Sequence, residues 1–228
     1  MPDDPRSPIP EWRFLQLTLL LAAWMLVTPH LAHHWLVQLL LQAFFLNTVL
    51  VTLWANPQWR INRRVLVGLW VVSVTGAVVA ALPLAGRWST LGKFAEAAGT
   101  LPLLVLMAVG ILRFVFRSRR LSSDGIFATI VVYLLIAFFF AQVYVLMVSA
   151  DPQTFSLPVA AAERPPHLLQ NDLFYFSLVT LATVGYGDIL PHGETARMLA
   201  MLEAVVGQFY VAVIVAVFVG MYTSQRRD

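Results

Sequence analysis

Long apolar runs follow one another along most of this chain, and they limit what it can fold into. The runs begin near residues 14, 35, 65, 97, 126 and 195, and short polar or Pro-containing stretches separate them. A helix of about 20 apolar residues crosses a bilayer. Only 12% of the residues are charged and the mean hydropathy is +0.76, whereas soluble domains carry about 25% charged residues. The sequence therefore predicts an all-α membrane protein with six transmembrane helices.

We expect these helices over residues 14–27, 35–54, 65–85, 97–116, 126–148 and 195–222. The first run is short, and Trp12 and Leu31 would extend it at the interfaces. A further apolar run, 173–182, is too short to span a bilayer and predicts a re-entrant helix. The chain contains no cysteine, which excludes disulfides, thiolate metal sites and thiol catalysis. The first run also lacks the small-residue cleavage site of a signal peptide.

The distribution of Lys and Arg predicts the orientation, because basic residues concentrate in cytoplasmic loops. With a cytoplasmic N-terminus, the outer side holds four basic residues, Arg87, Lys93, Arg164 and Arg197, and the inner side holds the other eleven of the fifteen. This asymmetry predicts a multi-pass protein of the plasma membrane, or of the inner membrane in a bacterium, with both termini cytoplasmic. It also explains the basic charge without a nucleic-acid partner.

The segment after the re-entrant helix carries the most specific pattern in the chain, Thr183-Val184-Gly185-Tyr186-Gly187-Asp188. Irregular backbone at membrane depth is tolerated where it is buried or lines a water-filled path. Four copies of such a loop around an axis present rings of backbone carbonyls, which can replace the hydration shell of a potassium ion. The carbonyls must then turn to one side, which requires left-handed conformations that Gly185 and Gly187 adopt without steric cost.

This string, placed between the last two spans, closely resembles the signature of the potassium channel family, and the resemblance covers about residues 126–222. It implies a homotetramer with no enzymatic activity and no cofactor, in which K⁺ is the permeant ligand. It implies that the filter is residues 183–187 and that the carbonyls of residues 183–186 bind K⁺. We accordingly divide the chain into a cytoplasmic N-terminus (1–13), a four-helix transmembrane domain (14–120) and a pore domain (121–228).

The resemblance also suggests residues that support the filter. Asp188 would lie at the outer mouth, bonded behind the filter, and Tyr175 matches a position where the family often has an aromatic donor to that Asp. Phe176 takes a second aromatic position but has no polar group. Val179 stands where some bacterial channels place a buried Glu, so this filter has fewer polar supports than theirs.

The last span resembles a pore-lining inner helix. Gly207 lies twenty residues after Gly187 and is either a hinge that opens an inner gate or a close-packing glycine. Gln208 would face the cavity or its wall. Valines recur every four residues below it, either as an apolar lining that gates by dewetting or as helix-packing residues: Val211, Val215 and Val219.

Glu203 is the one acid that we expect inside a span, at the depth of the filter. Intramembrane carboxylates are costly and usually functional. We favour a structural brace over a proton sensor, with Ser177 or Thr180 of the re-entrant helix as its partner.

The first four spans carry none of the features that a voltage sensor needs. The predicted fourth span has no charge over residues 97–112, and Arg113 and Arg117 follow only at its cytoplasmic end. We therefore expect weak voltage dependence or none. The basic stretch Arg113–Arg120 either binds anionic lipid or only sets the orientation. Five histidines of the outer side are pH-sensitive groups or simply solvated: His30, His33, His34, His167 and His192.

Three other functions remain open from the sequence. A non-selective cation channel would show departures within the filter, and this filter has none. A haem or redox protein would use His30, His33 and His34. A non-conducting accessory subunit would have little need for an intact filter. The sequence also leaves open whether the first four helices pack on the pore of their own subunit or of a neighbour.

Overall fold

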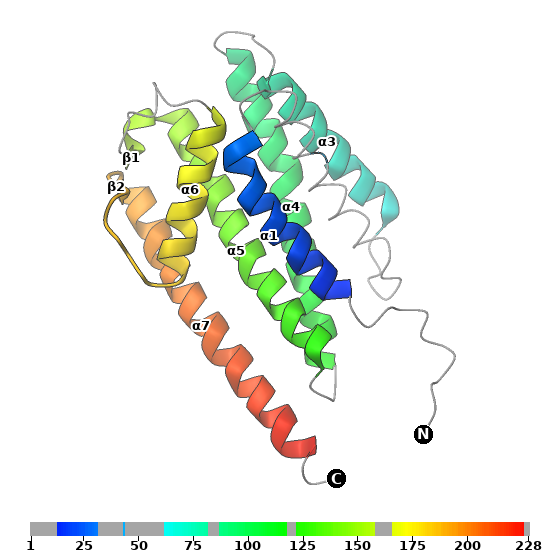
Figure 1. The fold of residues 1–228 in the computed structure, drawn as a ribbon. Coiled ribbons are helices and arrows are strands. Elements are labelled where there is room, and N and C mark those ends of the chain that lie inside the picture. Colours follow the sequence, from blue (N-terminus) through cyan, green and yellow to red (C-terminus); the bar gives the residue numbers. More distant parts are fainter. Residues whose placement is uncertain are drawn as a thin grey trace.

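The computed structural model describes residues 13–31, 43, 62–81, 87–117, 122–157 and 166–225. The described chain is a bundle of long helices (Figure 1). In chain order these are α1 (Arg13–Leu31), α3 (Arg63–Ala81), α4 (Arg87–Arg117), α5 (Ser123–Ala150), the 3₁₀ turn η1 (Pro152–Thr154), β1 (Phe155–Ser156), α6 (Pro166–Leu181), β2 (Leu190–Pro191) and α7 (Glu194–Gln225).

Within the described residues, α3, α4, α5 and α7 are long and apolar enough to cross a membrane, and α1 contains a shorter apolar stretch, Phe14–Ala23. The multi-pass, all-helical character predicted from the sequence is thus confirmed through four spans. The predicted span over 35–54 lies outside the described residues, apart from residue 43.

Helix α4 begins at Arg87, ten residues before the predicted start at 97. The first part of α4 contains polar residues, so the hydropathy of the sequence did not predict it as part of a span. This part of α4 packs closely on α3. A Cβ added to Gly92 would lie 2.5 Å from the backbone nitrogen of Ala80, and one added to Gly76 would lie 2.2 Å from that of Glu96. Glu96 is therefore a buried acid within a candidate span, so the expectation that Glu203 is the only acid inside a span was wrong.

Buried polar groups join these helices. The hydroxyls of Ser73 on α3 and Thr100 on α4 share a hydrogen bond of 2.6 Å. The Gln142 side chain on α5 donates to Glu96 Oε1 on α4, at 3.5 Å. These two hydrogen bonds fix the position of α4 along its neighbours α3 and α5.

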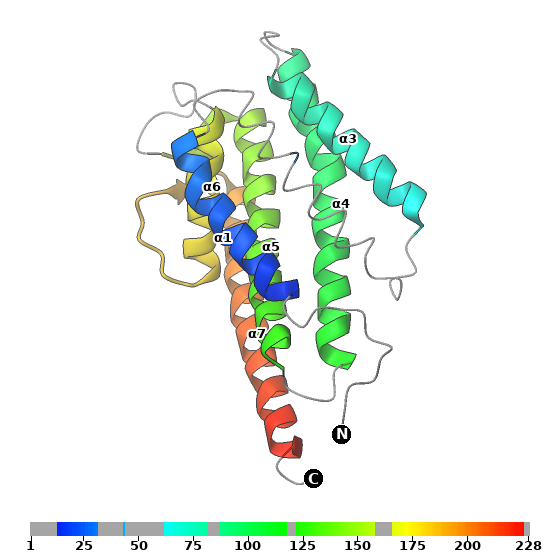
Figure 2. The ribbon, with the colours of Figure 1, turned by 45° about the vertical axis from the view of Figure 1, so that its right-hand side comes forward.

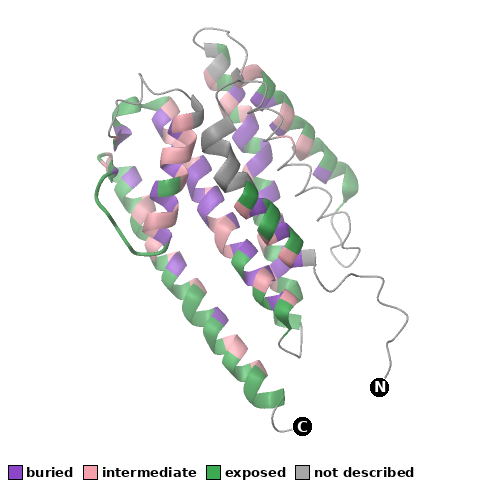
Figure 3. Cartoon of the chain, in the orientation of Figure 1, coloured by how far each residue is buried: buried purple, intermediate pink, exposed green. Residues whose placement is uncertain are grey.

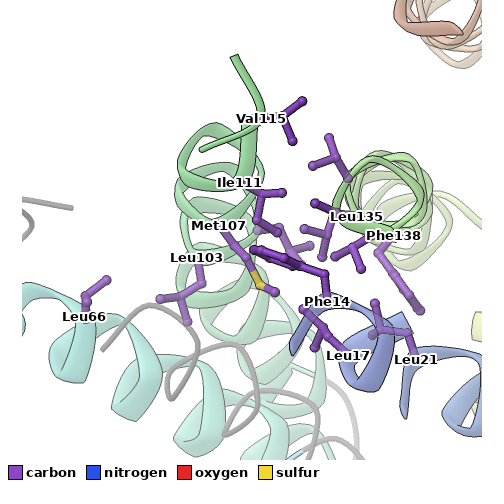
Figure 4. Packing of buried hydrophobic residues seen from close by; sticks show 14 residues of the cluster. Phe14, Leu17, Leu21, Leu66, Leu103, Met107, Ile111, Val115, Leu135 and Phe138 are labelled. Carbon is purple, nitrogen blue, oxygen red and sulfur yellow. The ribbon is translucent and has the colours of Figure 1, made fainter. Parts of the chain in front are cut away.

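Helix α5 lies at the centre of the bundle, with α1 across it and α4 beside it (Figure 2). Its first turn begins after Ser122, whose hydroxyl accepts a hydrogen bond from Gly125 N. The backbone N–H of Phe14 on α1 donates to Asp124 at 2.9 Å, which places the start of α1 beside the start of α5. The buried residues between α1, α4 and α5 include Leu103, Met107, Ile111, Leu135 and Phe138 (Figure 4).

Helices α1 and α4 pack against α5 of their own chain, and five residues, 118–122, separate α4 from α5.

Helix α6 enters the bundle from the far end of α5 and stops half-way along it. Its Ser177 hydroxyl donates to Ala137 O at 2.8 Å, near the middle of α5. After Leu181 the chain turns back, and β2 pairs with β1, which follows the end of α5. The chain thus enters and leaves the bundle at the same end, as a re-entrant segment would, and its helix begins at Pro166 and not near 173.

Helix α7 returns along the same side and projects past the rest of the bundle, with most of its surface exposed (Figure 3). Only four of its 32 residues are buried: Ala196, Glu203, Gly207 and Ile214. The exposed residues include large apolar side chains, such as Phe209 at 68% and Met198 at 62%. An apolar helix with so little cover within its own chain needs lipid or other subunits around it.

Candidate functional site

The loop between α6 and β2 has an alternating backbone. Thr183, Gly185 and Gly187 have φ angles of 57°, 60° and 79°, and these are the positive φ values in the described chain. A positive φ at every second residue reverses the usual alternation of peptide directions, so that successive carbonyls can turn to one side of the loop. The sequence predicted this conformation for the two glycines but not for Thr183.

Thr183 is the costly member of this series, because a left-handed conformation of a β-branched residue is a true outlier. The loop base keeps it in place. The backbone N–H of Thr183 donates to Thr180 O, and the N–H groups of Val184 and Gly185 both reach Val179 O, at 2.9 and 3.4 Å. The C-terminal turn of α6 thus continues directly into the loop and fixes its N-terminal end.

Behind the loop, the Tyr175 hydroxyl donates to Asp188 Oδ2 at 2.9 Å. The rings of Tyr175 and Tyr186 stack, with centroids 6.3 Å apart and an angle of 5° between their planes. This is the pairing that the resemblance suggested for Tyr175. It ties the second half of the loop to α6, because Asp188 and Tyr186 belong to the loop and Tyr175 to the helix.

The C-terminal end of the loop is anchored to the segment that follows α5. Phe155 and Ser156 pair with Pro191 and Leu190 in the two-stranded sheet. The backbone N–H of His192 donates to Thr154 O at 2.8 Å. Both ends of the loop are therefore held, and its middle, Val184 to Gly187, is exposed in the single chain.

Helix α7 closes against the end of α6 at Gly207. A Cβ added there would lie 2.2 Å from Leu181 O and 3.1 Å from Leu181 C. This is a backbone-to-backbone approach that only glycine permits, which favours the close-packing interpretation of Gly207 over a free hinge. One residue further, Gln208 Nε2 donates to Thr183 Oγ1 at 3.1 Å.

One turn before Gly207, Glu203 is completely buried between three helices. Its carboxylate accepts a 2.7 Å hydrogen bond from the Tyr144 hydroxyl on α5. Its other oxygen lies within hydrogen-bond distance of the Ser177 hydroxyl on α6, whose single proton is shared between Glu203 and Ala137 O. Ser177 was one of the two partners expected from the sequence. Tyr144 was missed, because nothing in the sequence relates a position 59 residues away to Glu203.

A cluster of three aromatic rings lies around this carboxylate, with the rings edge-on to one another and their centroids 5.2 to 5.3 Å apart. The rings are those of Tyr144, Phe155 and Phe176. Phe176, which lacks a polar group, thus serves as packing. Together Glu203 and Gly207 contact α6 at Ser177 and Leu181, so successive turns of the two helices are joined along one line.

The comparisons with known proteins agree with this geometry. Residues 126–224 match a protein family described as ion channel. The chain is 35% identical to Protein LctB of Bacillus caldotenax over 98 residues, which cover 43% of this chain and 72% of that protein. It is 34% identical to Protein LctB of Geobacillus stearothermophilus over 111 residues, 48% of this chain and 80% of that protein. The chain belongs to the ion channel family.

A shorter match connects this ion channel with a potassium channel. Over 53 residues it is 40% identical to the inward rectifier potassium channel Kirbac3.1 of Paramagnetospirillum magnetotacticum, which covers 23% of this chain and 18% of that protein. No solved structure matches the chain. The family match begins at residue 126, so it covers the predicted pore domain and not the helices before α5.

The remaining predicted residues of this ion channel lie on the exposed parts of α4 and α7. Val211, Val215 and Val219 are 48%, 55% and 60% exposed, which places them on a face of α7 that its own chain leaves open. Arg113 and Arg117 are exposed in the last two turns of α4, and residues 118–120 lie outside the described chain.

Within the described residues, no group of three or more His, Asp or Glu side chains is placed to hold a metal ion. Of the three histidines of the haem alternative, His30, His33 and His34, the last two lie outside the described chain. Among the residues that sequence reasoning missed, Tyr144 and Glu96 are buried polar groups whose partners come from distant helices.

Proposed function

We propose that this chain is one subunit of a homotetrameric, potassium-selective channel, with residues 183–187 as its selectivity filter. Ions would pass along the four-fold axis, and the carbonyl oxygens of Thr183, Val184, Gly185 and Tyr186 would take the place of water around each K⁺. No cofactor is needed, and the protein catalyses no reaction.

The observation that carries this proposal is the run of positive φ angles at Thr183, Gly185 and Gly187. Carbonyls that turn to one side of a loop give several oxygen ligands in a row, which suits a large, weakly hydrated cation. The side chains between them, Val184 and Tyr186, take the other side, and Tyr186 stacks on Tyr175. The backbone carbonyl oxygens of the loop would then bind the ion, and its side chains would hold the loop in place.

A single loop of this kind is an incomplete site. Its middle is exposed in the isolated chain, and one row of carbonyls cannot surround an ion. The open apolar face of α7, which includes Met201, Val205 and Phe209, supports assembly around an axis next to the loop. Four copies would complete the ligand rings and cover this face.

The proposed topology has both termini on the cytoplasmic side. The start of α1 lies beside the start of α5, and α7 ends at the same end of the bundle (Figure 1). The filter loop lies toward the opposite end, which we propose to be the outer side. Arg113 and Arg117 at the inner end can then contact anionic headgroups of the inner leaflet.

Gating is proposed to involve the lower half of α7. Val211, Val215 and Val219 would line the inner part of the pore and gate it by dewetting. We propose that voltage has little effect, because α4 carries no positive charge between Lys93 and Arg113.

Flux measurements in liposomes test the proposal. Protein reconstituted under a K⁺ gradient should conduct K⁺, and the same preparation under a Na⁺ gradient should not. Gly185→Ala should abolish selective flux, because the φ of 60° is strained for any residue with a Cβ. Gly68→Ala is the matched control, since a Cβ at this helical glycine meets no described atom within 4 Å. Equal flux of both ions through the wild type would contradict the proposal.

A further inference from the structure

The contact between Gln208 and Thr183 is the one polar contact between the inner helix and the filter loop in the described chain. Gln208 Nε2 donates to Thr183 Oγ1 at 3.1 Å. It joins α7, the helix that we propose to gate the pore, to the innermost residue of the proposed filter. Both side chains are exposed in the single chain, on the side where the other subunits of a tetramer would stand.

The position of this contact follows from the residue before it. Gly207 allows α7 to approach within contact of Leu181 O, the last residue of α6. Gln208 is then carried to the base of the loop, two residues beyond Leu181. A side chain at position 207 would displace α7, so the contact between Gln208 and Thr183 depends on Gly207.

The contact also determines the hydrogen bonding and the orientation of the Thr183 hydroxyl. A hydroxyl has one donor and two acceptor lone pairs, and a glutamine amide has donors on its nitrogen and an acceptor on its oxygen. Donation from Gln208 occupies one lone pair of Thr183 Oγ1 and leaves the other for a cation. Because Thr183 is held at a positive φ, the orientation of the hydroxyl is set by both its backbone and this amide.

We propose that Gln208 determines the cation affinity of the innermost site of the channel, by holding a ring of four Thr183 hydroxyls with their oxygens toward the axis. The site binds a cation of the size of K⁺ that is dehydrated on its filter side and still hydrated on its cavity side. The amide oxygen of Gln208, on the other arm of the same side chain, is available to that remaining water. This inference rests on the proposed channel function and adds to it a residue that sets the affinity of one ion site.

A divalent cation of nearly the same radius, Ba²⁺, is the probe for this site. Because it has the size of the same oxygen ring and its double charge interacts more strongly with the oxygens, we expect it to leave slowly and to block conduction while it occupies the innermost site. Ba²⁺ added to the cytoplasmic side of wild-type channels in a planar bilayer should block the K⁺ current.

The test compares Gln208→Met with the wild type. Methionine has a similar length but cannot donate to the hydroxyl, so the inhibitory concentration of internal Ba²⁺ should rise about tenfold, which corresponds to about 1.4 kcal/mol. The K⁺ to Na⁺ permeability ratio should stay unchanged, since the carbonyl sites of residues 184–186 remain. Gln225→Met, the same substitution roughly 25 Å further along α7, should leave the block unchanged.

A double-mutant comparison assigns the effect to the hydroxyl. In a Thr183→Ser background the oxygen remains, and Gln208→Met should weaken the block as before. In a Thr183→Val background the oxygen is absent, and Gln208→Met should have no further effect. A Gln208→Met channel that is blocked like the wild type, or an equal effect in the Val background, would overturn the inference while leaving the channel function in place. Absence of K⁺ current from the wild type would overturn both.

Discussion

The close approach of Gly207 to Leu181 makes a strong prediction for Gly207→Ala. The new Cβ would lie 2.2 Å from Leu181 O, whereas a carbon in contact with a carbonyl oxygen needs about 3.3 Å. Helix α7 and the end of α6 must then separate by roughly 1 Å. The obstructing atom belongs to the backbone, so no side-chain rotation relieves the overlap.

The cost should lie in the range of overpacked sites, about 1–3 kcal/mol. For a chain of this size that corresponds to a fall in Tm of roughly 3–10 °C. The displacement also reaches the backbone of the filter, because Thr183 follows Leu181 by two residues. We therefore expect lower K⁺ selectivity in the same variant.

Thermal unfolding of the purified protein in detergent measures the first effect and liposome flux the second. Gly220→Ala on the same helix is the control, because a Cβ there meets no described atom within 4 Å. Its Tm should equal that of the wild type or exceed it, since alanine is the better helix former. If Gly207→Ala leaves the Tm unchanged and alters only gating, then Gly207 acts as a hinge and the packing argument is wrong.

Three further predictions concern the surroundings of the filter. Glu203→Gln keeps an acceptor for the buried Tyr144 hydroxyl and should leave the K⁺ reversal potential intact, and a lost reversal potential in this variant would contradict the brace. Glu203→Leu removes the acceptor and should destabilise the protein by about 1–3 kcal/mol, because the Tyr144 hydroxyl is left unpaired, whereas Ser177 still donates to Ala137 O. K⁺ that binds the folded state raises the Tm of the protein. Tyr175→Phe removes the hydrogen bond to Asp188, so the K⁺ concentration that gives half of this rise in Tm should increase. An unchanged dependence of the Tm on K⁺ would show that the contact does not support the ion sites. Neutralising Arg113 and Arg117 should leave the conductance–voltage curve as shallow as in the wild type, and a steep curve that this double substitution abolishes would refute the expected lack of voltage sensing.

The lengths of the apolar runs and the string at residues 183–188 were sufficient to predict the helical class and the ion channel family. Both signals are local in the chain. The bilayer sets the length of an apolar run, and the filter requires its residue types within six consecutive positions. The pairing of Tyr175 with Asp188, 13 residues apart, was accessible for the same reason.

Other features depend on packing and could not be read from the sequence. The N-terminal third of α4 is polar, yet it is helical because Gly76 and Gly92 let α3 and α4 meet. Tyr144 becomes a partner of Glu203 only once α5 and α7 are side by side. The left-handed Thr183 was missed because threonine does not favour that conformation, and only the loop base explains it.

The central claim is that residues 183–187 select K⁺, and a competition of fluxes tests it most directly. Wild-type protein in liposomes that contain K⁺ inside, with Na⁺ outside, should develop a membrane potential close to the K⁺ equilibrium value, and Gly185→Ala should collapse it. A potential near zero in the wild type, together with ion flux, would show a pore that does not distinguish K⁺ from Na⁺ and would contradict the assignment of the filter.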